Sequence, residues 1–369
     1  MNNKKTYKIA VLPWDWIGPE VCDEAVKVLD AVWEKFWINF KTEFWYIWGA
    51  WYEKYGEHFP NETKRIVDNS DAVLFGSVGW PVDKQMEKKW KDCEKKSILG
   101  IRKHLDLVVN IRPARIWSEL SHISVLKEEK IPKNWLNIIT FRELSWGLYF
   151  WEHTTYVEDW IRKARDICEY DENTIKYISE FCFKSAKQSG KKIAVVDKAN
   201  VLDTSRLWRT IVDEVSKDYP EVKFEYVLVD SCAMHLVQKP EQFEYILTEN
   251  LFGDILSDLT STFSWSLGLL ASASFSKTNF GLYEPSGGSA PDIAWKWIAN
   301  PIAQILCVAM MLRHSFLMEE VAKSIENAVD KTISNWFRTW DIYRKIEGET
   351  LVATKEIWEE IIKRIKIKN

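Results

Sequence analysis

The sequence predicts an α/β fold with a largely parallel sheet, in two domains or one large one. Short apolar runs typical of buried strands alternate with segments whose apolar residues recur at helical spacing. The chain has 369 residues, which is enough for a large hydrophobic core. It shows no flexible linker, repeat or low-complexity segment, so we expect it to cross between lobes more than once. No G-x-G-x-x-G motif follows the first strand, which argues against a standard Rossmann fold.

The first half of the chain alternates these two patterns from its start. Residues 7–13 (YKIAVLP) are a short apolar run, which predicts a buried strand. Residues 19–35 carry apolar side chains at helical spacing, such as Val21, Ala25 and Val28, which predicts an amphipathic helix. By the same patterns we expect strands at 40–47, 72–76, 105–111 and 137–141, and helices at 61–70 and 97–104.

The second half continues the alternation with longer helices. Residues 169–190 predict a long helix that ends at Gly190, because glycine is favoured just beyond a helix C-terminus. Residues 191–196 and 222–229 are apolar enough to predict strands. The remaining helices are expected at 207–219, from about 250, and at 301–316, 319–334 and 354–367.

Composition and charge limit the class of protein. The net charge is −4, which gives no reason to expect nucleic acid or an anionic membrane as a partner. The six cysteines are scattered without a C-x-x-C pair, so we expect neither a disulfide framework nor a zinc site. No apolar run approaches the roughly 18 residues needed to span a bilayer. These features predict a globular protein of a reducing compartment such as the cytoplasm.

The stretch from 250 to 259 (NLFGDILSDL) places two carboxylates four residues apart. In a helix, Asp254 and Asp258 lie on one face, one above the other. Apolar residues occupy most of the remaining positions, so we expect this helix to be buried. Two buried carboxylates need a compensating cation, and a hard divalent ion with oxygen ligands is the simplest one. The alternative is a solvated acidic face near a helix start.

Asp230 and Lys198 both stand at the ends of predicted strands. Functional residues of open α/β sheets gather at the carboxyl ends of strands. Asp230 would complete a set of three carboxylates for Mg²⁺ or Mn²⁺, with positions left open for substrate oxygens. Lys198 could transfer a proton if a nearby metal ion lowered its pKa. The alternatives are an aspartate that caps the next turn and a solvated surface lysine.

Three arginines and one tyrosine are candidates for substrate contacts. Arg102, Arg112 and Arg142 stand at the ends of predicted helices or strands. A guanidinium group binds a carboxylate through two hydrogen bonds, so three of them in one cleft would bind a dicarboxylate. Tyr149 could act as a general acid. Taken singly, each is also compatible with a surface arginine or an aromatic core residue.

The segment 283–301 (YEPSGGSAPDIAWKWIANP) is rich in turn-forming residues. Gly287, Gly288 and Ser289 offer exposed backbone N–H groups. Asp292 could accept hydrogen bonds from a ribose diol, the contact by which an acidic residue selects NAD over its 2′-phosphorylated form. An ordinary surface loop is the alternative.

Several motifs, in this order along nearly the whole chain, resemble the isocitrate/isopropylmalate dehydrogenase family, and its isopropylmalate enzymes in particular. They are LPWDWIGPE (12–20), GSVGWP (76–81), IRKHLDLVVNIRPA (101–114), FRELSWGLYFW (141–151), VDKANVL (196–202), VDSCAMHLV (229–237), NLFGDILSDL (250–259) and EPSGGSAPDIA (284–294). The resemblance implies a two-lobed fold whose central sheet crosses both lobes. The first lobe would comprise 1–107 and 265–369, and the second 108–264.

The resemblance also implies a reaction. It is the oxidative decarboxylation of (2R,3S)-3-isopropylmalate to 4-methyl-2-oxopentanoate in leucine synthesis, with NAD⁺ as oxidant and Mg²⁺ or Mn²⁺ as metal. The protein would be a cytoplasmic homodimer with active sites shared between its subunits. The alternatives are another β-decarboxylating dehydrogenase, acting on isocitrate, homoisocitrate, tartrate or malate, and an inactive protein of the same fold.

Substrate contacts follow from the resemblance position by position. Arg102, Arg112 and Arg142 would hold the malate carboxylates, and Asp230 would also lie at the substrate. Ile98 stands four residues before Arg102, where isocitrate enzymes carry a polar asparagine. An aliphatic side chain at this position suits an isopropyl group.

Metal and proton-transfer residues follow in the same way. Asp254 and Asp258 would bind the metal together with Asp230 of the partner subunit. Lys198 of the partner subunit would take the hydroxyl proton, helped by that Asp230. Tyr149 would protonate the enolate.

The resemblance also assigns the NAD site, in which Asp292 in place of a Lys-Tyr pair favours NAD over NADP. The residues that would line this site are Ile17, Glu284, Gly287, Gly288, Ser289, Ala290, Asp292 and Asn300.

Tryptophan is unusually abundant, with 21 residues against 14 glycines. Glycine in loops supplies positive φ or a close backbone approach, and tryptophan in a left-handed conformation costs about 1–2 kcal/mol. We therefore expect the chain to keep the family's fold and to bind NAD poorly. The positions where the family has glycine and this chain has tryptophan are Trp14, Trp16, Trp80, Trp146, Trp151, Trp265, Trp295 and Trp297.

Overall fold

The described residues form two compact units, each built from segments distant in the sequence. The computed structural model describes residues 6–45, 47, 52, 56–79, 87, 90, 93–132 and 136–367. Unit 1 comprises Met1–Leu105, Trp117–Ile123 and Ser264–Asn369, and unit 2 comprises Asp106–Ile116 and Ser124–Phe263.

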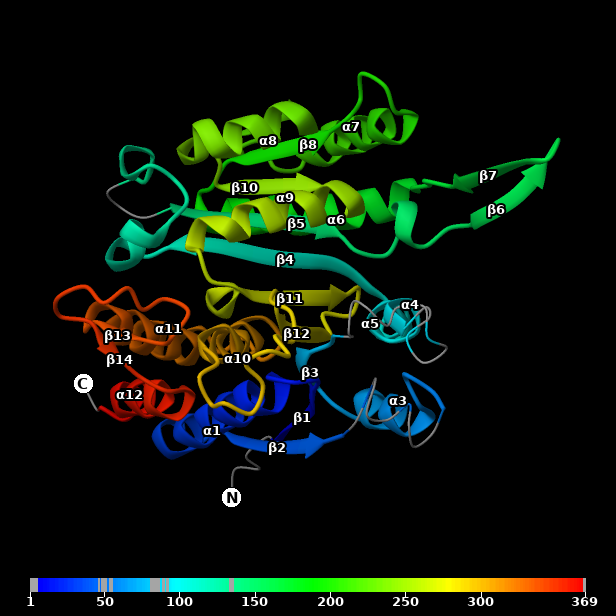
Figure 1. Ribbon diagram of the computed structural model, residues 1–369. Helices are drawn as coiled ribbons and strands as arrows, with labels where there is room; N and C mark the ends of the chain where they lie inside the picture. Colours follow the sequence, from blue (N-terminus) through cyan, green and yellow to red (C-terminus); the bar gives the residue numbers. More distant parts are fainter. Residues whose placement is uncertain are drawn as a thin grey trace. The chain divides into compact units, whose positions relative to one another are not determined.

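Unit 1 is a five-stranded sheet covered by helices (Figure 1). All neighbouring strands are parallel except the last pair, which is antiparallel. The strand order is β2 (Asn39–Phe44), β1 (Thr6–Trp14), β3 (Ala72–Ser77), β12 (Gly281–Pro285) and β11 (Ala271–Ser276).

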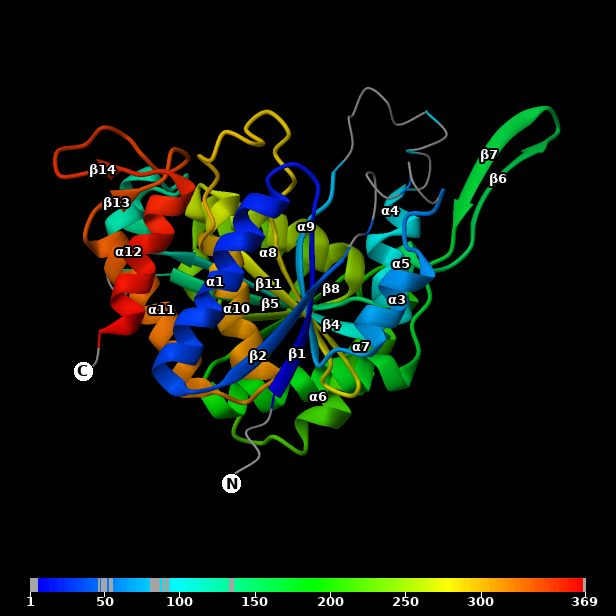
Figure 2. The ribbon, with the colours of Figure 1, turned by 90° about the horizontal axis from the view of Figure 1, so that it is seen from below.

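Helices lie on both sides of this sheet, with α1 and α12 on one side of β1 and α3 on the other (Figure 2). Helix α10 packs against β11 and β12 and is buried along most of its length, as its nearly unbroken apolar sequence requires. The helices are α1 (Gly18–Phe36), α3 (Asn61–Asp68), α4 (Cys93–Lys96), α5 (Ile98–His104), α10 (Ile302–His314), α11 (Glu319–Ser334) and α12 (Thr354–Lys366), with a small pair of strands, β13 (Phe337–Arg338) and β14 (Thr350–Leu351).

Unit 2 has five strands of its own. Its first pair is antiparallel and the rest are parallel. Figure 2 shows α6 and α7 on one face of these strands and α8 and α9 on the other. The strand order is β4 (Leu107–Ile116), β5 (Leu136–Glu143), β10 (Tyr245–Thr248), β8 (Ile193–Asp197) and β9 (Phe224–Leu228), and the helices are α6 (Glu172–Ser189), α7 (Asp203–Ser216), α8 (Val229–Gln238) and α9 (Asn250–Ser261).

The predicted α/β class with a large central sheet is confirmed, but several elements were missed, among them β6, β7, β10, β11 and α8. The hairpin of β6 (His153–Glu158) and β7 (Ile161–Asp166) is exposed along both strands, so no buried face marks it in the sequence. Strand β10 has only four residues, too few for a pattern. Helix α8 begins directly after β9, so Asp230 lies in the first turn of a helix and not at a strand end.

The two units differ from the lobes expected from the sequence mainly at Trp117–Ile123, which belongs to unit 1. Side chains explain this assignment. The indole of Trp117 donates a hydrogen bond to Asp330 over 2.8 Å, and Ser334 donates one to Glu119 over 2.7 Å. As to membranes, none of the described helices has the length and apolar character needed to cross a bilayer.

Candidate active site

Helix α9 carries the two carboxylates that the sequence singled out. It begins directly after β10, so the end of a buried strand fixes the start of the helix. Gly253, Leu256 and Ser257 are buried against unit 2, whereas the Asp254 and Asp258 side chains are 32% and 73% exposed. The expectation of a helix buried all round is wrong, because Ile255 is 57% exposed and one face of α9 is open.

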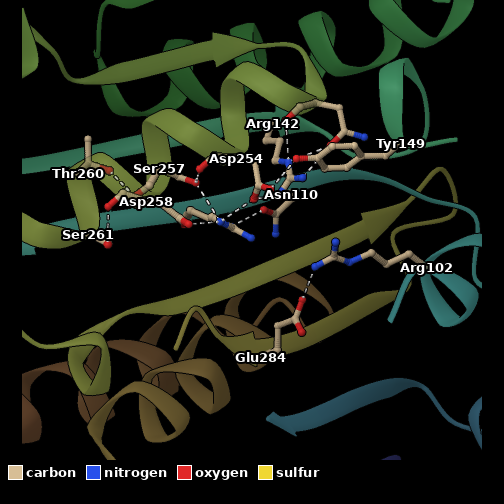
Figure 3. A network of polar contacts seen from close by, with 12 residues as sticks. Arg102, Asn110, Arg142, Tyr149, Asp254, Ser257, Asp258, Thr260, Ser261 and Glu284 are labelled. Atoms are coloured by element: carbon tan, nitrogen blue, oxygen red, sulfur yellow. Dashed lines mark hydrogen bonds and ion pairs between the residues drawn. The ribbon is translucent and has the colours of Figure 1, made fainter. Parts of the chain in front are cut away.

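Arg142, at the end of β5, anchors the start of α9. Its side chain is buried, and its Nε donates to both the carbonyl and the Oδ1 of Asn250 over 3.0 Å. Its Nη1 donates to Oδ1 of Asp254 over 2.5 Å. Gly253 leaves room for this contact, since a Cβ there would lie 2.6 Å from the Arg142 Cγ. Arg142 is therefore fixed, with one edge of its guanidinium on the carboxylate (Figure 3).

Arg112, on β4, reaches the same helix one turn further along. Its Nη1 donates to Ser257 Oγ over 2.9 Å and lies 3.3 Å from Asp254 and 3.2 Å from Asp258. Its Nε donates to Asn110 Oδ1 over 2.9 Å. β4 and β5 are neighbours, and they bring two of the three predicted arginines to one face of α9.

Tyr149 joins this cluster from a short 3₁₀ helix, Gly147–Tyr149. Its hydroxyl donates to Oδ2 of Asp254 over 3.0 Å, and its ring lies 5.7 Å from the Arg142 guanidinium. Figure 3 shows the tyrosine and the arginine converging on this carboxylate. The phenol is thus placed where it can deliver a proton close to the carboxylate pair.

The electrostatics of α9 favour an added cation. Although most of the Asp258 side chain is exposed, partial desolvation raises its pKa, Arg112 lowers it, and the charge of Asp254 raises it. An ion between these two carboxylates would stabilise the charged form of both, and their oxygen donors suit Mg²⁺ or Mn²⁺. Among the described residues of one chain, however, no three His, Cys, Asp or Glu side chains gather as a metal site.

Lys198 and Asp230 form a separate pair in unit 2. The Lys198 Nζ donates to Asp230 Oδ1 over 2.7 Å. This hydrogen bond lowers the pKa of Asp230. No hydrogen bond or ion pair of the described residues joins the pair to Asp254 or Asp258. The expected carboxylate triad is therefore not assembled within one chain.

Arg102 and Ile98 lie on α5, in unit 1. The Arg102 Nη2 donates to Glu284 Oε1 over 3.0 Å, so this arginine pairs with a residue that was predicted for the cofactor site. Ile98 is buried, at 6% exposure, four residues before Arg102 on the same helix.

A cavity of about 780 Å³ opens in unit 1 beside the loop after β12. This volume is in the range of sites for drug-sized ligands. Two glycines form part of its wall: Gly288 has open space where a Cβ would be, and a Cβ on Gly268 would lie 2.7 Å from Asn300. A nucleotide is therefore compatible with this cavity.

Five of the eight predicted cofactor residues line the cavity, namely Ile17, Gly287, Gly288, Ala290 and Asn300. Glu284, Ser289 and Asp292 do not belong to its wall. Ser289 still supports it, because its carbonyl accepts a hydrogen bond from the backbone N–H of Ile17 over 3.2 Å.

Sequence reasoning missed a second loop that closes the cavity. Asp341 and Arg344 line it, and Asn300 donates to Asp341 over 3.0 Å. It also missed Glu20 of α1, which is fully buried and accepts backbone hydrogen bonds from Trp295 and Trp297. A buried acid in the first turn of an otherwise apolar helix face was the available signal for Glu20.

Five of the tryptophans at family glycine positions do have positive φ: Trp14, Trp16, Trp265, Trp295 and Trp297. Trp146 is extended, at φ −129°, and Trp151 is not among the positive-φ residues. Trp80 lies outside the described residues.

Comparisons with known proteins agree over nearly the whole chain. The sequence profile described as isocitrate/isopropylmalate dehydrogenase matches residues 8–361. A 3-isopropylmalate dehydrogenase from Thermotoga maritima is 47% identical over 365 residues, covering 97% of this chain and 99% of the relative. One from Clostridium acetobutylicum is 45% identical over 363 residues, covering 97% of this chain and 99% of the relative.

Solved structures give the same picture of the fold. An isocitrate dehydrogenase from Methylococcus capsulatus superposes with a TM-score of 0.82 at 31% identity, covering 98% of this chain and 100% of the other. A β-decarboxylating dehydrogenase from Thermococcus kodakarensis superposes with a TM-score of 0.78 at 33% identity, covering 98% and 96%.

Proposed function

The chain belongs to the isocitrate/isopropylmalate dehydrogenase family, and on that premise we propose that it oxidises and decarboxylates (2R,3S)-3-isopropylmalate to 4-methyl-2-oxopentanoate with NAD⁺. The observation that carries the proposal is the cluster on α9, where Arg112, Arg142 and Tyr149 surround Asp254 and Asp258. Such a cluster has the fixed cations and the carboxylate pair that a malate-type substrate with a divalent ion requires.

Arginine supplies the binding energy for the two substrate carboxylates. Arg142 is held by Asn250 and Arg112 by Asn110 and Ser257, so each guanidinium is positioned before substrate arrives. Arg102 would be the third, and Ile98 one turn before it would face the isopropyl group. A buried aliphatic residue there leaves a third carboxylate of the isocitrate type without a partner.

Metal and cofactor positions follow from the donors present. Asp254 and Asp258 would hold Mg²⁺ or Mn²⁺ together with Asp230 of the partner subunit in a homodimer. The cavity of unit 1 would hold NAD⁺, with Asn300 and the backbone of Gly287 and Gly288 at its wall. When bound, these groups supply a hydride acceptor and a Lewis acid for the hydroxyl and the later enolate.

Two residues move protons. Lys198 of the partner subunit, as the neutral amine, would take the proton of the substrate hydroxyl and become an ammonium, and its bond to Asp230 keeps Nζ oriented. Tyr149 would return a proton to the carbon that loses CO₂, and its bond to Asp254 fixes the phenol near the substrate. The arginines keep the remaining carboxylates in place through both steps.

The test is a substrate panel followed by NADH absorbance, with Mg²⁺ and K⁺ present. We expect isopropylmalate to be oxidised with a kcat/KM at least about tenfold above isocitrate, tartrate or malate, since one misplaced polar group costs more than 1.4 kcal/mol. Asp254→Asn should abolish turnover, and Asp218→Asn, at an exposed position, should not. Faster turnover of another acid would overturn the substrate, and no turnover of any would favour an inactive protein of this fold.

A further inference from the structure

Tryptophan dominates the left-handed backbone positions of this protein. Among the described residues, fourteen that are not glycine have positive φ, and eight of these are tryptophan. Only glycine adopts this conformation routinely, with asparagine and aspartate next, because Cβ crowds the following carbonyl. These eight residues are Trp14, Trp16, Trp37, Trp160, Trp265, Trp295, Trp297 and Trp336, with φ between 55° and 71°.

Two of the eight occupy local motifs that specify glycine independently of any relative. Trp37 ends α1 at φ 58° and ψ 36°, and its N–H bonds the carbonyl of Trp33. Gly190 ends α6 with nearly the same geometry, φ 69° and ψ 21°, and the same kind of hydrogen bond. The chain therefore uses glycine and tryptophan interchangeably at one kind of helix end.

The β6–β7 hairpin gives the second motif. Glu158 pairs with Ile161, so the loop has two residues, Asp159 and Trp160, both with positive φ. Such a type I′ turn strongly prefers Asp-Gly or Asn-Gly. Here the sequence reads Asp-Trp, and the indole is 98% exposed. Nothing in the fold rewards a large aromatic side chain at this place.

Most of these tryptophans are less buried than Trp117 and Trp208, although Trp14 is only 7% exposed, and Trp33 and Trp340 are exposed without positive φ. Trp117 and Trp208 are 4% and 2% exposed, with the first bonded to Asp330 and the second stacked edge-on against Tyr170. Both have ordinary negative φ. By contrast, six of the eight are among the exposed large side chains: Trp37, Trp160, Trp265, Trp295, Trp297 and Trp336.

We infer that these eight positions are glycine in the protein as its source organism makes it, through one codon read there as glycine. The codon has to be closely related both to the tryptophan codon and to a glycine codon, and UGA meets this condition. It differs from the tryptophan codon UGG only in its third base and from the glycine codon GGA only in its first. Eight more residues beyond the 14 glycines also bring the chain toward the roughly 7% glycine of ordinary proteins.

The inference has a consequence for the cavity of unit 1. Trp265 lines it, and Trp295 and Trp297 follow the predicted cofactor loop. Glycine at 265 removes an indole from the wall of the cavity. Glycine at 295 and 297 retains the backbone N–H groups that donate hydrogen bonds to the Glu20 carboxylate. Without indoles at these three positions, the loops beside the cavity would leave their backbone open to close approach by a nucleotide.

The first test reads the gene and the natural protein. We expect UGA at the eight positions and UGG at Trp117 and Trp208. Tandem mass spectrometry of peptides from the source organism should show glycine at the eight positions and tryptophan at the two. UGG codons at the eight positions, or tryptophan in those peptides, would overturn the inference. Neither readout depends on catalysis.

The second test measures stability of the full chain by urea unfolding. Each of Trp37→Gly and Trp160→Gly should raise the folded-to-unfolded ratio about fivefold, because glycine relieves the left-handed strain. Trp117→Gly and Trp208→Gly are the controls and should lower that ratio by more than about a hundredfold, because they empty buried sites. A loss of stability in Trp37→Gly and Trp160→Gly would contradict glycine at these positions.

Discussion

At the residue scale, the carboxylate of Asp254 is the point where three side chains meet. Arg142 and Arg112 supply positive charge, and Tyr149 supplies a neutral donor. A neutral donor on a carboxylate flanked by two guanidinium groups contributes little to holding the helix, because the arginines already do so. The phenol is therefore available for proton transfer.

Tyr149→Phe tests this reading. We expect kcat for isopropylmalate to fall about 10²–10³-fold while KM changes little, because the substitution removes a proton donor and leaves both arginines in place. Circular dichroism should be unchanged. Tyr156→Phe, on the exposed β6 strand, is the matched control and should retain full activity. An unaffected kcat in Tyr149→Phe would exclude the phenol as the acid.

Glu249 and Glu143 make up a second residue-scale feature, a buried carboxyl pair beside α9. Burial raises the pKa of Glu249 from 4.5 to about 7, and the charges of Glu143 and Asp197 add to this rise. Burial likewise raises the pKa of Glu143 to about 7, although hydrogen bonds from Ser145 and Trp146 lower it. Between pH 4.5 and 7 these two carboxyls keep protons in the folded protein that they release in the unfolded chain, so their contribution to stability falls as pH rises.

Glu249→Gln should therefore flatten this dependence. The variant cannot ionise, so it should be about 1–3 kcal/mol more stable than the parent above pH 7 and nearly equal to it below pH 4.5. Urea unfolding at several pH values measures this. Glu241→Gln, at an exposed position, should change stability by less than about 0.5 kcal/mol throughout. A difference between variant and parent that does not grow from pH 4.5 to 7 would contradict the assignment.

At the element scale, β5 and α9 are held together through one glycine. Gly253 allows α9 to lie against the side chain of Arg142, with a hypothetical Cβ only 2.6 Å from Cγ and 2.8 Å from Cβ of that arginine. Gly253→Ala should therefore displace Arg142, raise KM at least about tenfold and cost about 1–3 kcal/mol of stability.

Gly100→Ala is the matched control for that change. Gly100 also lies within a helix, α5, but its nearest atoms would be 3.7 Å away, which is ordinary contact. Alanine there should leave KM unchanged and stabilise the helix by about 0.5–1 kcal/mol. If the two substitutions had equal effects, the position of the Arg142 side chain would not depend on the absence of a side chain at Gly253.

The cofactor loops give an element-scale prediction of their own. Trp265 lines the cavity, so its indole occupies part of the wall that a nucleotide would contact. Trp265→Gly should tighten NADH binding about tenfold in a fluorescence titration, because the indole no longer crowds the cavity and the left-handed backbone at residue 265 is no longer strained. Trp160→Gly, at the hairpin tip, is the control for strain alone and should leave NADH affinity unchanged.

Most elements with a strongly apolar buried face could be predicted from the sequence, whereas β11, which is buried but consists largely of serine and alanine, and the exposed β6–β7 hairpin were missed. β3 is buried throughout and α10 nearly so, and both were expected close to their observed bounds. The β6–β7 hairpin has no buried face, and its turn signal is hidden because Trp160 stands where glycine would mark it.

The site shows the same division. The carboxylates of α9 and their arginines could be predicted because charge at buried positions stands out, whereas Asn110, Asn250 and Ser257, which hold the arginines, are ordinary polar residues in sequence. Their roles depend on which strands are neighbours, and that is a property of the tertiary fold. Asp341 was missed for the same reason, because 41 positions separate it from Asn300.

At the scale of the whole molecule, the reactive groups of unit 2 fall into two sets. Arg112, Arg142 and the α9 carboxylates form one, and Lys198 with Asp230 forms the other. In one chain the described residues gather no three-acid metal site, whereas the proposed mechanism places a lysine and a third carboxylate at the metal. A second copy of the chain would meet this need if each site combined one set from each subunit, and Ile255 on α9 is exposed.

Mixing two inactive variants tests that arrangement directly. Asp254→Asn disables the first set and Lys198→Met the second, so each homodimer should be inactive. After the two are unfolded and refolded together, half of the dimers should be mixed, and each mixed dimer has one site with both sets intact. Activity should therefore return to about a quarter of the parent value, as random pairing in a twofold dimer requires. If both sets served the same site within one chain, refolding together would restore nothing, whereas refolding each variant alone shows what mixing adds.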